Sequence, residues 1–140
     1  MKILFVVLLI VLGIFSMAGA VEKGNLCSLL TKSDVESALN RKMKEPEKAG
    51  NGCVYATVDI PYDILIVEVE KGGISGFNQN KKNKAKAGKM KPVEGLGDDA
   101  YYDDRQLNIL KKRDWISLQS SSLSLQTLQG LAKKVMERLK

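Results

Sequence analysis

Serine, lysine and aspartate are the side chains through which this chain could carry out catalysis, because its sequence contains no histidine. Without histidine it can form neither a Ser-His-Asp triad nor a Cys-His pair, and no imidazole can bind a metal or transfer protons near neutral pH. A Ser–Lys pair stays open because both residue types are abundant, but no spacing singles out one pair. We therefore predict no catalytic residues and no cofactor, and keep a small hydrolase as the alternative.

The densest group of carboxylates comprises Asp98, Asp99, Asp103 and Asp104. Paired carboxylates could bind a hard cation or act as acid and base. Their spacing does not match a D-x-D-x-D-G calcium loop, and aspartates beside a short strand are typical of turns, so we predict no metal site. The preceding Gly95-Leu96-Gly97 resembles half of a phosphate-binding loop, but it lacks the Lys-Thr element and a following helix. We predict a tight turn there.

A lysine-rich segment is the main charge feature of a chain with a net charge of +6. Six lysines fall within eleven residues, with no acidic residue among them: Lys81, Lys82, Lys84, Lys86, Lys89 and Lys91. Such a segment could bind anionic lipid, an anionic envelope polymer or nucleic acid. No aromatic residue is interleaved, so base stacking is not indicated and we predict no specific nucleic-acid partner. A solvated basic face is the alternative, and it is the commoner outcome for a charge run.

The first twenty residues predict export. Lys2 supplies a positive charge, residues 3–15 are apolar apart from one glycine, and Ala18-Gly19-Ala20 provides the small residues of a signal-peptidase site. Cleavage after residue 20 leaves 21–140 as a single exported domain, periplasmic or secreted, without a transmembrane span. A buried N-terminal helix and an uncleaved anchor are the alternatives, although the apolar run is shorter than the roughly 20 residues that span a bilayer.

Cys27 and Cys53 are the only cysteines of the chain. Two cysteines in a small exported domain usually pair, so we predict one disulfide that stabilises the fold by about 3–4 kcal/mol. Two buried thiols, a redox pair and half of a metal site are the alternatives. The C-x-x-C spacing of redox pairs is absent, and zinc would need four ligands.

The elements that would position these residues follow from periodicity and from turn residues. Helices are predicted over 31–40, where Thr31 and Asp34 form a capping signal, over 74–90, and over 125–139, which carries an apolar stripe. Strands are predicted over 53–58, 63–70, 99–102, 107–111 and 115–120, with a loop over 41–52 and with Glu68 and Glu70 emerging towards one face. Short connections favour an α+β fold with an antiparallel sheet of about five strands flanked by helices.

Three short motifs resemble a family of uncharacterised exported bacterial domains, many of which are lipoproteins. They are the stretch that begins Cys27-Ser28-Leu29-Leu30-Thr31 and runs to Val35, the strand Gly52-Cys53-Val54-Tyr55, and the stretch Val93 to Tyr101 around Gly95-Leu96-Gly97-Asp98. The resemblance implies a PsbP-like α/β sandwich and places the two family cysteines at Cys27 and Cys53. The chain departs from the lipoprotein members because it has no lipid-site cysteine. The family supplies no catalytic residues to transfer.

The function indicated by these features is a non-catalytic extracytoplasmic binding or accessory domain, whose partner is an envelope protein or an anionic polymer or lipid. A small envelope hydrolase is one alternative. Binding of anionic lipid or polymer through the lysine-rich segment is the other.

Overall fold

The computed structural model describes residues 25–139, so the predicted signal segment and its cleavage site lie outside the described residues. Within that range no helix is long and apolar enough to cross a membrane. The elements follow in the order η1 (Leu26–Ser28), α1 (Lys32–Leu39), β1 (Glu47–Ala49), β2 (Gly52–Ala56), β3 (Ile64–Glu70), α2 (Ile74–Lys86), β4 (Lys91–Pro92), β5 (Asp99–Asp103), β6 (Gln106–Lys111), β7 (Asp114–Ser120) and α3 (Leu125–Arg138). The predicted α+β class is confirmed.

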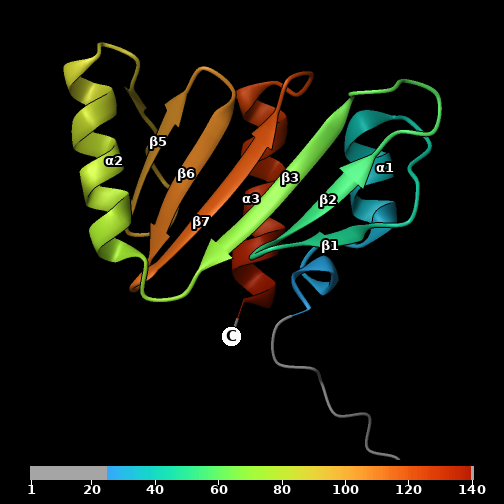
Figure 1. Ribbon diagram of the computed structural model, residues 1–140, viewed down its shortest axis with the longest axis horizontal. Coiled ribbons are helices and arrows are strands. Elements are labelled where there is room, and N and C mark those ends of the chain that lie inside the picture. Colours follow the sequence, from blue (N-terminus) through green and yellow to red (C-terminus); the bar gives the residue numbers. More distant parts are fainter. Residues whose placement is uncertain (1–24, 140) are drawn as a thin grey trace, which may run out of the picture.

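All strands join one antiparallel sheet of seven strands in the order β1-β2-β3-β7-β6-β5-β4 (Figure 1). The two halves of the sheet meet where β3 pairs with β7, from Leu65 opposite Ser120 to Glu70 opposite Trp115. The five predicted strands are present, but the predicted number of about five is wrong. Two short edge strands, β1 and β4, were missed, and β1 lies inside the predicted loop 41–52. All of their residues are exposed, so they carry no apolar pattern, and β4 contains a proline, as edge strands tolerate.

One face of the sheet is covered by η1, α1 and α3, and the main core lies there (Figure 1). The predicted stripe of α3 supplies Leu128, Ala132 and Val135, which are fully buried against strand residues such as Ile109 and Leu118. Helix α1 begins at the predicted capping box, in which the Thr31 side chain accepts from the Asp34 amide and the Asp34 carboxylate accepts from the Thr31 amide. Both helices therefore form as their sequences predict.

The opposite face is only half covered. Phe77 of α2 packs against Tyr101 and Trp115, with ring centroids 5.3 and 6.3 Å away. These two strand residues alternate with core residues, so they point to the face opposite α1 and α3. The predicted helix 74–90 is present but ends at Lys86. No described helix covers this face over β1, β2 and β3, and we call that area the open half-face (Figure 1).

Cys27 and Cys53 form the predicted disulfide, with their Cα atoms 5.1 Å apart. The bond connects η1 to β2 and closes a loop across 26 positions of sequence. It therefore fixes the first described element to the sheet, next to the core.

Candidate functional site

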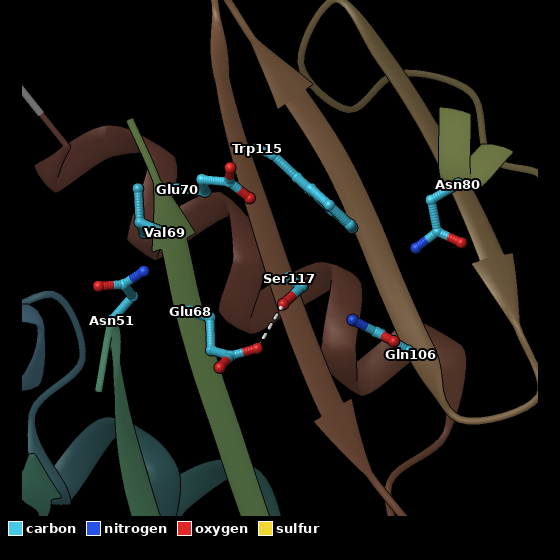
Figure 2. A pocket seen from close by; sticks show the side chains of 8 residues that line it. All are labelled: Asn51, Glu68, Val69, Glu70, Asn80, Gln106, Trp115 and Ser117. Atoms are coloured by element: carbon cyan, nitrogen blue, oxygen red, sulfur yellow. Dashed lines mark hydrogen bonds between the residues drawn. The ribbon is translucent and has the colours of Figure 1, made fainter. Parts of the chain in front are cut away.

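An open groove lies between α2 and β3, beside the open half-face (Figure 2). Its volume is about 210 Å³. The lining side chains are mostly polar: Asn51, Glu68, Val69, Glu70, Asn80, Gln106, Trp115 and Ser117. Four structural elements and one loop contribute to it, so the site exists only in the folded chain.

The register of the sheet brings these side chains into rows. Glu70 lies opposite Trp115, and in the next row Glu68 lies opposite Ser117, which in turn lies opposite Asn108. Because side chains alternate along a strand, the glutamates of β3 face the groove while Leu65, Val67 and Val69 are buried. The predicted emergence of Glu68 and Glu70 towards one face is thus confirmed.

Trp115 forms a fixed wall of the groove. Its indole Nε1 donates to Asn108 Oδ1 at 3.0 Å, and its ring meets Phe77 edge-on at an interplanar angle of 81°. A Cβ atom at Gly76 would lie 3.3 Å from the indole ring, so glycine lets α2 approach Trp115 closely. Glycine inside a helix costs about 1 kcal/mol relative to alanine, and this close approach explains why the helix contains one.

A layer of buried polar groups lies behind this wall. Asn108 is fully buried and Ser117 is 6% exposed, although both lie on a sheet face that a purely structural packing would fill with apolar side chains. Ser117 Oγ donates to Glu68 Oε2 at 3.4 Å, and Asn108 Nδ2 donates to the Gln106 carbonyl at 3.4 Å. Both contacts are longer than a typical hydrogen bond. Asn108 Oδ1 also accepts from the Trp115 indole, so this layer is connected to the groove wall.

The Tyr101 hydroxyl belongs to the same layer, beneath α2. It is buried and has no hydrogen-bond partner among the described residues. Burial, together with the negative charges of Asp103 and Asp99, raises the pKa of the Tyr101 hydroxyl well above its usual range. Tyr101 is therefore a neutral group at physiological pH.

Glu68 and Glu70 are the charged groups of the groove. Both are exposed, and neither has a cationic side chain of the described chain within 4 Å. The nearby Asp114, by contrast, pairs with Lys71 at 2.7 Å. The groove is therefore an acidic spot on a chain whose net charge is +6.

The structure divides the predicted lysine-rich segment into two groups. Lys81 pairs with Asp99 at 2.6 Å and Lys84 pairs with Asp103 at 3.3 Å, both across the contact between α2 and β5. The other lysines make no ion pair within residues 25–139: Lys82, Lys86, Lys89 and Lys91. The segment is thus less basic than its sequence indicates, because β5 neutralises two of its six charges.

The predicted acidic cluster does not act as one group. Asp98 accepts from the Lys112 amide, Asp99 and Asp103 pair with lysines of α2, and Asp104 sits in a turn with a positive φ of 44°. Across the described residues, no group of three or more acidic, cysteine or histidine side chains could hold a metal ion. At the predicted tight turn, Gly95 and Gly97 both have a positive φ, of 75° and 59°, and a Cβ atom at Gly97 would clash with the Leu110 carbonyl oxygen.

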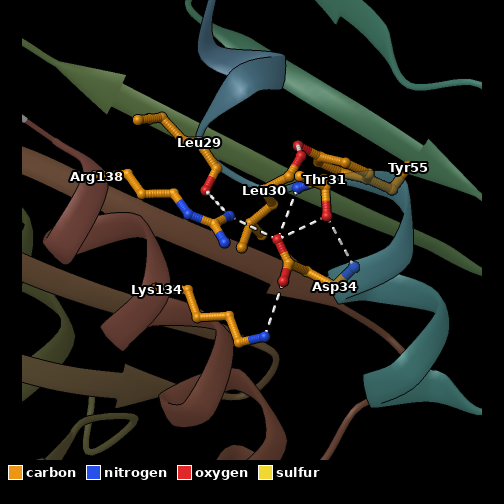
Figure 3. Close-up of polar contacts among 7 residues, drawn as sticks. All are labelled: Leu29, Leu30, Thr31, Asp34, Tyr55, Lys134 and Arg138. Atoms are coloured by element: carbon orange, nitrogen blue, oxygen red, sulfur yellow. Dashed lines mark hydrogen bonds and ion pairs between the residues drawn. The ribbon is translucent and has the colours of Figure 1, made fainter.

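A second polar cluster lies on the covered face, and we call it the Asp34 clamp (Figure 3). The carboxylate of Asp34 contacts Arg138 Nη1 at 2.6 Å, Lys134 Nζ at 2.8 Å and the Thr31 amide at 2.8 Å. Arg138 also donates to the Leu29 carbonyl at 2.9 Å. These contacts, led by the hydrogen bond from Arg138, hold the pKa of Asp34 far below its usual range. The clamp joins α1, α3 and η1.

Buried Tyr55 completes this region by donating to the Leu30 carbonyl at 2.9 Å (Figure 3). Burial raises the pKa of the Tyr55 hydroxyl to about 12. All polar groups of the Asp34 clamp therefore have partners within the fold, which marks it as a structural feature.

The sequence predicts that Glu68 and Glu70 emerge towards one face of the sheet, but it singles out no residue of the groove as part of a site. Asn108 and Ser117 are polar residues within otherwise apolar strands. They lie directly opposite each other on β6 and β7, so their side chains share one face of the sheet. That coincidence was the available signal, but it requires the β6–β7 register. Trp115 looked like an ordinary strand aromatic, because nothing local places α2 beside it.

Comparison with known protein families, with curated proteins and with solved structures gave no match. The resemblance to exported bacterial domains and to the PsbP-like sandwich therefore stays a prediction.

Proposed function

We propose that this chain is an extracytoplasmic binding or accessory domain that holds a small, positively charged polar ligand in the groove between α2 and β3. The observation that carries the proposal is the pair Glu68 and Glu70, two carboxylates without a cationic partner in the described chain, beside the fixed indole of Trp115. An amine that enters the groove meets both carboxylates and an aromatic ring.

Charge and geometry support this class of ligand. Alternate residues of a strand lie roughly 7 Å apart, so Glu68 and Glu70 repel each other until a cation lies between them. An ammonium group near an indole gains about 0.5–1 kcal/mol or more from cation–π attraction. The carboxamides of Asn51, Asn80 and Gln106 add hydrogen-bond donors and acceptors for the polar remainder of the ligand.

The extracytoplasmic part of the proposal rests on the predicted signal segment, and the disulfide is compatible with it. Intact mass of the protein from its native host tests it. A chain that begins at Val21 supports export with cleavage, whereas a chain that keeps residues 1–20 contradicts cleavage.

Trp115 provides a direct test of the ligand, because it is the only tryptophan of the chain. Its fluorescence should change in a saturable way when 1,4-diaminobutane is added, and it should not change with glucose at the same concentration. Glu68→Gln with Glu70→Gln should weaken the response at least about tenfold, since each lost charge contact contributes on the order of 1 kcal/mol.

Glu94→Gln with Glu137→Gln is the matched control, because it removes the same charge from exposed positions outside the groove. A control variant that weakens binding as much as the groove variant would show that only net charge matters, and the proposal would then be wrong. A response to glucose but not to the diamine would also contradict it.

A hydrolase would use the same groove, with Ser117 as nucleophile and Glu68 as its base. The 3.4 Å contact between Ser117 Oγ and Glu68 Oε2 is the observation in its favour. Turnover of ester substrates that disappears in Ser117→Ala would support this second candidate.

Anionic polymer bound by the unpaired lysines is a third candidate. Its observation is the set of four lysines without an ion pair in residues 25–139, and loss of polymer binding in Lys82→Gln with Lys86→Gln would support it.

A further inference from the structure

The loop between β2 and β3 carries an unusual concentration of exposed apolar side chains. The described part of the chain has three large hydrophobic residues that are exposed, and all three lie in this loop: Val58 at 53%, Ile60 at 41% and Tyr62 at 90%. Scattered single hydrophobic residues are normal on a protein surface, but a group of three within five positions marks a contact site.

The backbone at Tyr62 adds a second observation. Its φ is 76°, in the left-handed region that suits glycine or asparagine and costs energy for an aromatic residue. Because its side chain is nearly fully exposed, Tyr62 gains almost no packing within the fold in return. Neither packing within the described chain nor backbone preference accounts for a tyrosine at this position.

Hydrogen bonds within the loop and to the neighbouring segment 41–44 hold the loop in place. Thr57 Oγ1 donates to the Ile60 carbonyl at 2.8 Å, and the Val58 amide donates to the Lys42 carbonyl at 2.9 Å. Asp63, which closes the loop, is buried and pairs with Arg41 at 3.8 Å. A loop that is already ordered loses little conformational entropy when it binds.

The charges around the loop favour an anionic partner. Lys42 and Lys44 are exposed on the neighbouring segment and have no ion pair within the described chain, whereas Asp59 is the one acidic group at the tip without a cationic partner. Each lysine near an anionic membrane surface gains about 1 kcal/mol, and a net charge of +6 adds attraction at longer range.

We propose that the loop 58–62 inserts its apolar side chains into the headgroup region of an anionic membrane. Tyrosine suits this depth because its ring is apolar and its hydroxyl is polar. Three side chains of one loop offer much less than the about 800 Å² that each partner buries in a stable protein interface, but a lipid surface needs only a few such anchors together with charge. The inference is independent of the groove.

Co-sedimentation of the mature protein, purified from its host and shown by intact mass to begin at Val21, with lipid vesicles tests the proposal. Vesicles of equimolar phosphatidylglycerol and phosphatidylcholine should bind the protein, and vesicles of phosphatidylcholine alone should bind it more weakly. Ile60→Ser with Tyr62→Asn should lower the partition coefficient about tenfold, because it removes most of the apolar area of the tip. Asparagine tolerates the left-handed backbone, so this variant should keep its melting temperature.

Two further variants separate the loop from general charge. Lys42→Gln with Lys44→Gln should reduce binding severalfold, whereas Lys82→Gln with Lys86→Gln, which carries the same net charge, should reduce it less. Figure 1 shows α2, which carries the latter pair, at the far end of the sheet from the β2–β3 loop. Asp59→Asn should increase binding, which a merely structural role of the loop would not produce.

Equal losses for the two lysine pairs, or full binding by the Ile60→Ser with Tyr62→Asn variant, would overturn the proposal. Absence of binding to anionic vesicles at low ionic strength would overturn it as well.

Discussion

Two carboxylate sites lie on opposite faces of the same sheet and differ in how the fold treats them. Asp34, on the covered face, receives hydrogen bonds from Thr31, Lys134 and Arg138, and only 11% of its side chain is exposed. Glu68 and Glu70, on the other face, are exposed and have no cationic partner in the described chain. The same chemical group thus has several donors of the fold around it at one site and no cationic partner at the other.

The contrast separates stability from recognition. A carboxylate with several donors around it stabilises the fold, and its removal leaves cations and a helix terminus without a partner. Two exposed carboxylates without a cationic partner contribute little to folding and repel each other, and in the proposed function a cationic ligand would relieve that repulsion. Variants at the two sites should therefore change different measurements.

The largest expected effect is on the covered face, at the disulfide. Cys53→Ser should lower the free energy of unfolding by about 2–5 kcal/mol, because the bond holds η1, whose neighbours Leu29 and Leu30 accept bonds from Arg138 and Tyr55. Denaturant titration measures the loss. Thiol labelling of the unreduced wild-type protein is the control and should find no free cysteine. A variant as stable as the wild type would show that the bond does not support the clamp.

The second effect compares the two carboxylate sites directly. Asp34→Asn should lower the free energy of unfolding by about 1–3 kcal/mol, because it breaks charge-assisted hydrogen bonds to Arg138 and Lys134. Glu68→Gln with Glu70→Gln should leave stability unchanged or raise it by about 0.5 kcal/mol, since it removes a repulsion. Equal destabilisation by the two variants would contradict the view that Asp34 stabilises the fold whereas Glu68 and Glu70 do not.

The pH dependence of the free energy of unfolding should reveal the contribution of Asp34 to stability. The pKa of Asp34 lies near 3.8 in the unfolded chain and far lower in the folded one. A depressed folded pKa means that the stabilisation is complete above pH 3.8 and is lost as the pH falls towards the folded value. Unfolding measured between pH 6 and pH 2 should therefore show a steeper loss for the wild type than for Asp34→Asn. Parallel curves would contradict the assignment.

Features that depend only on neighbours along the chain could be predicted from the sequence. The capping box at Thr31 and Asp34 and the apolar stripe of α3 need only local spacing. The disulfide was predicted from the only two cysteines together with the predicted export signal. The partners of Asp34 could not be predicted, because Lys134 is 100 positions away and becomes a neighbour only when α1 and α3 pack on one face. The same holds for Trp115, which becomes a groove wall through Gly76 of α2.

The edge strands and the lysine-rich segment also depend on contacts that local sequence does not reveal. β1 and β4 have no pattern of their own, because each pairs on one side with a strand that determines its position. The six lysines of the predicted basic segment look equivalent in sequence, but the register that brings Asp99 and Asp103 beneath α2 makes Lys81 and Lys84 different from the rest.

The smallest predicted effect on stability concerns the lysines of α2, which, like the carboxylates, divide into side chains with an ion pair and side chains without one. Lys81→Gln with Lys84→Gln should lower the free energy of unfolding by about 1 kcal/mol, because both side chains are only about one-third exposed and Lys84 faces the buried carboxylate of Asp103. Lys82→Gln with Lys86→Gln removes the same charge from positions without an ion pair, and should change stability by less than about 0.5 kcal/mol. Denaturant titration at low and high salt measures both. The difference in free energy of unfolding between the two variants should become smaller as the salt concentration rises, because charges in partly exposed ion pairs are screened over about 8 Å at physiological ionic strength. Identical behaviour of the two variants would mean that the lysines are equivalent in solution, and that β5 does not divide them into structural and free charges.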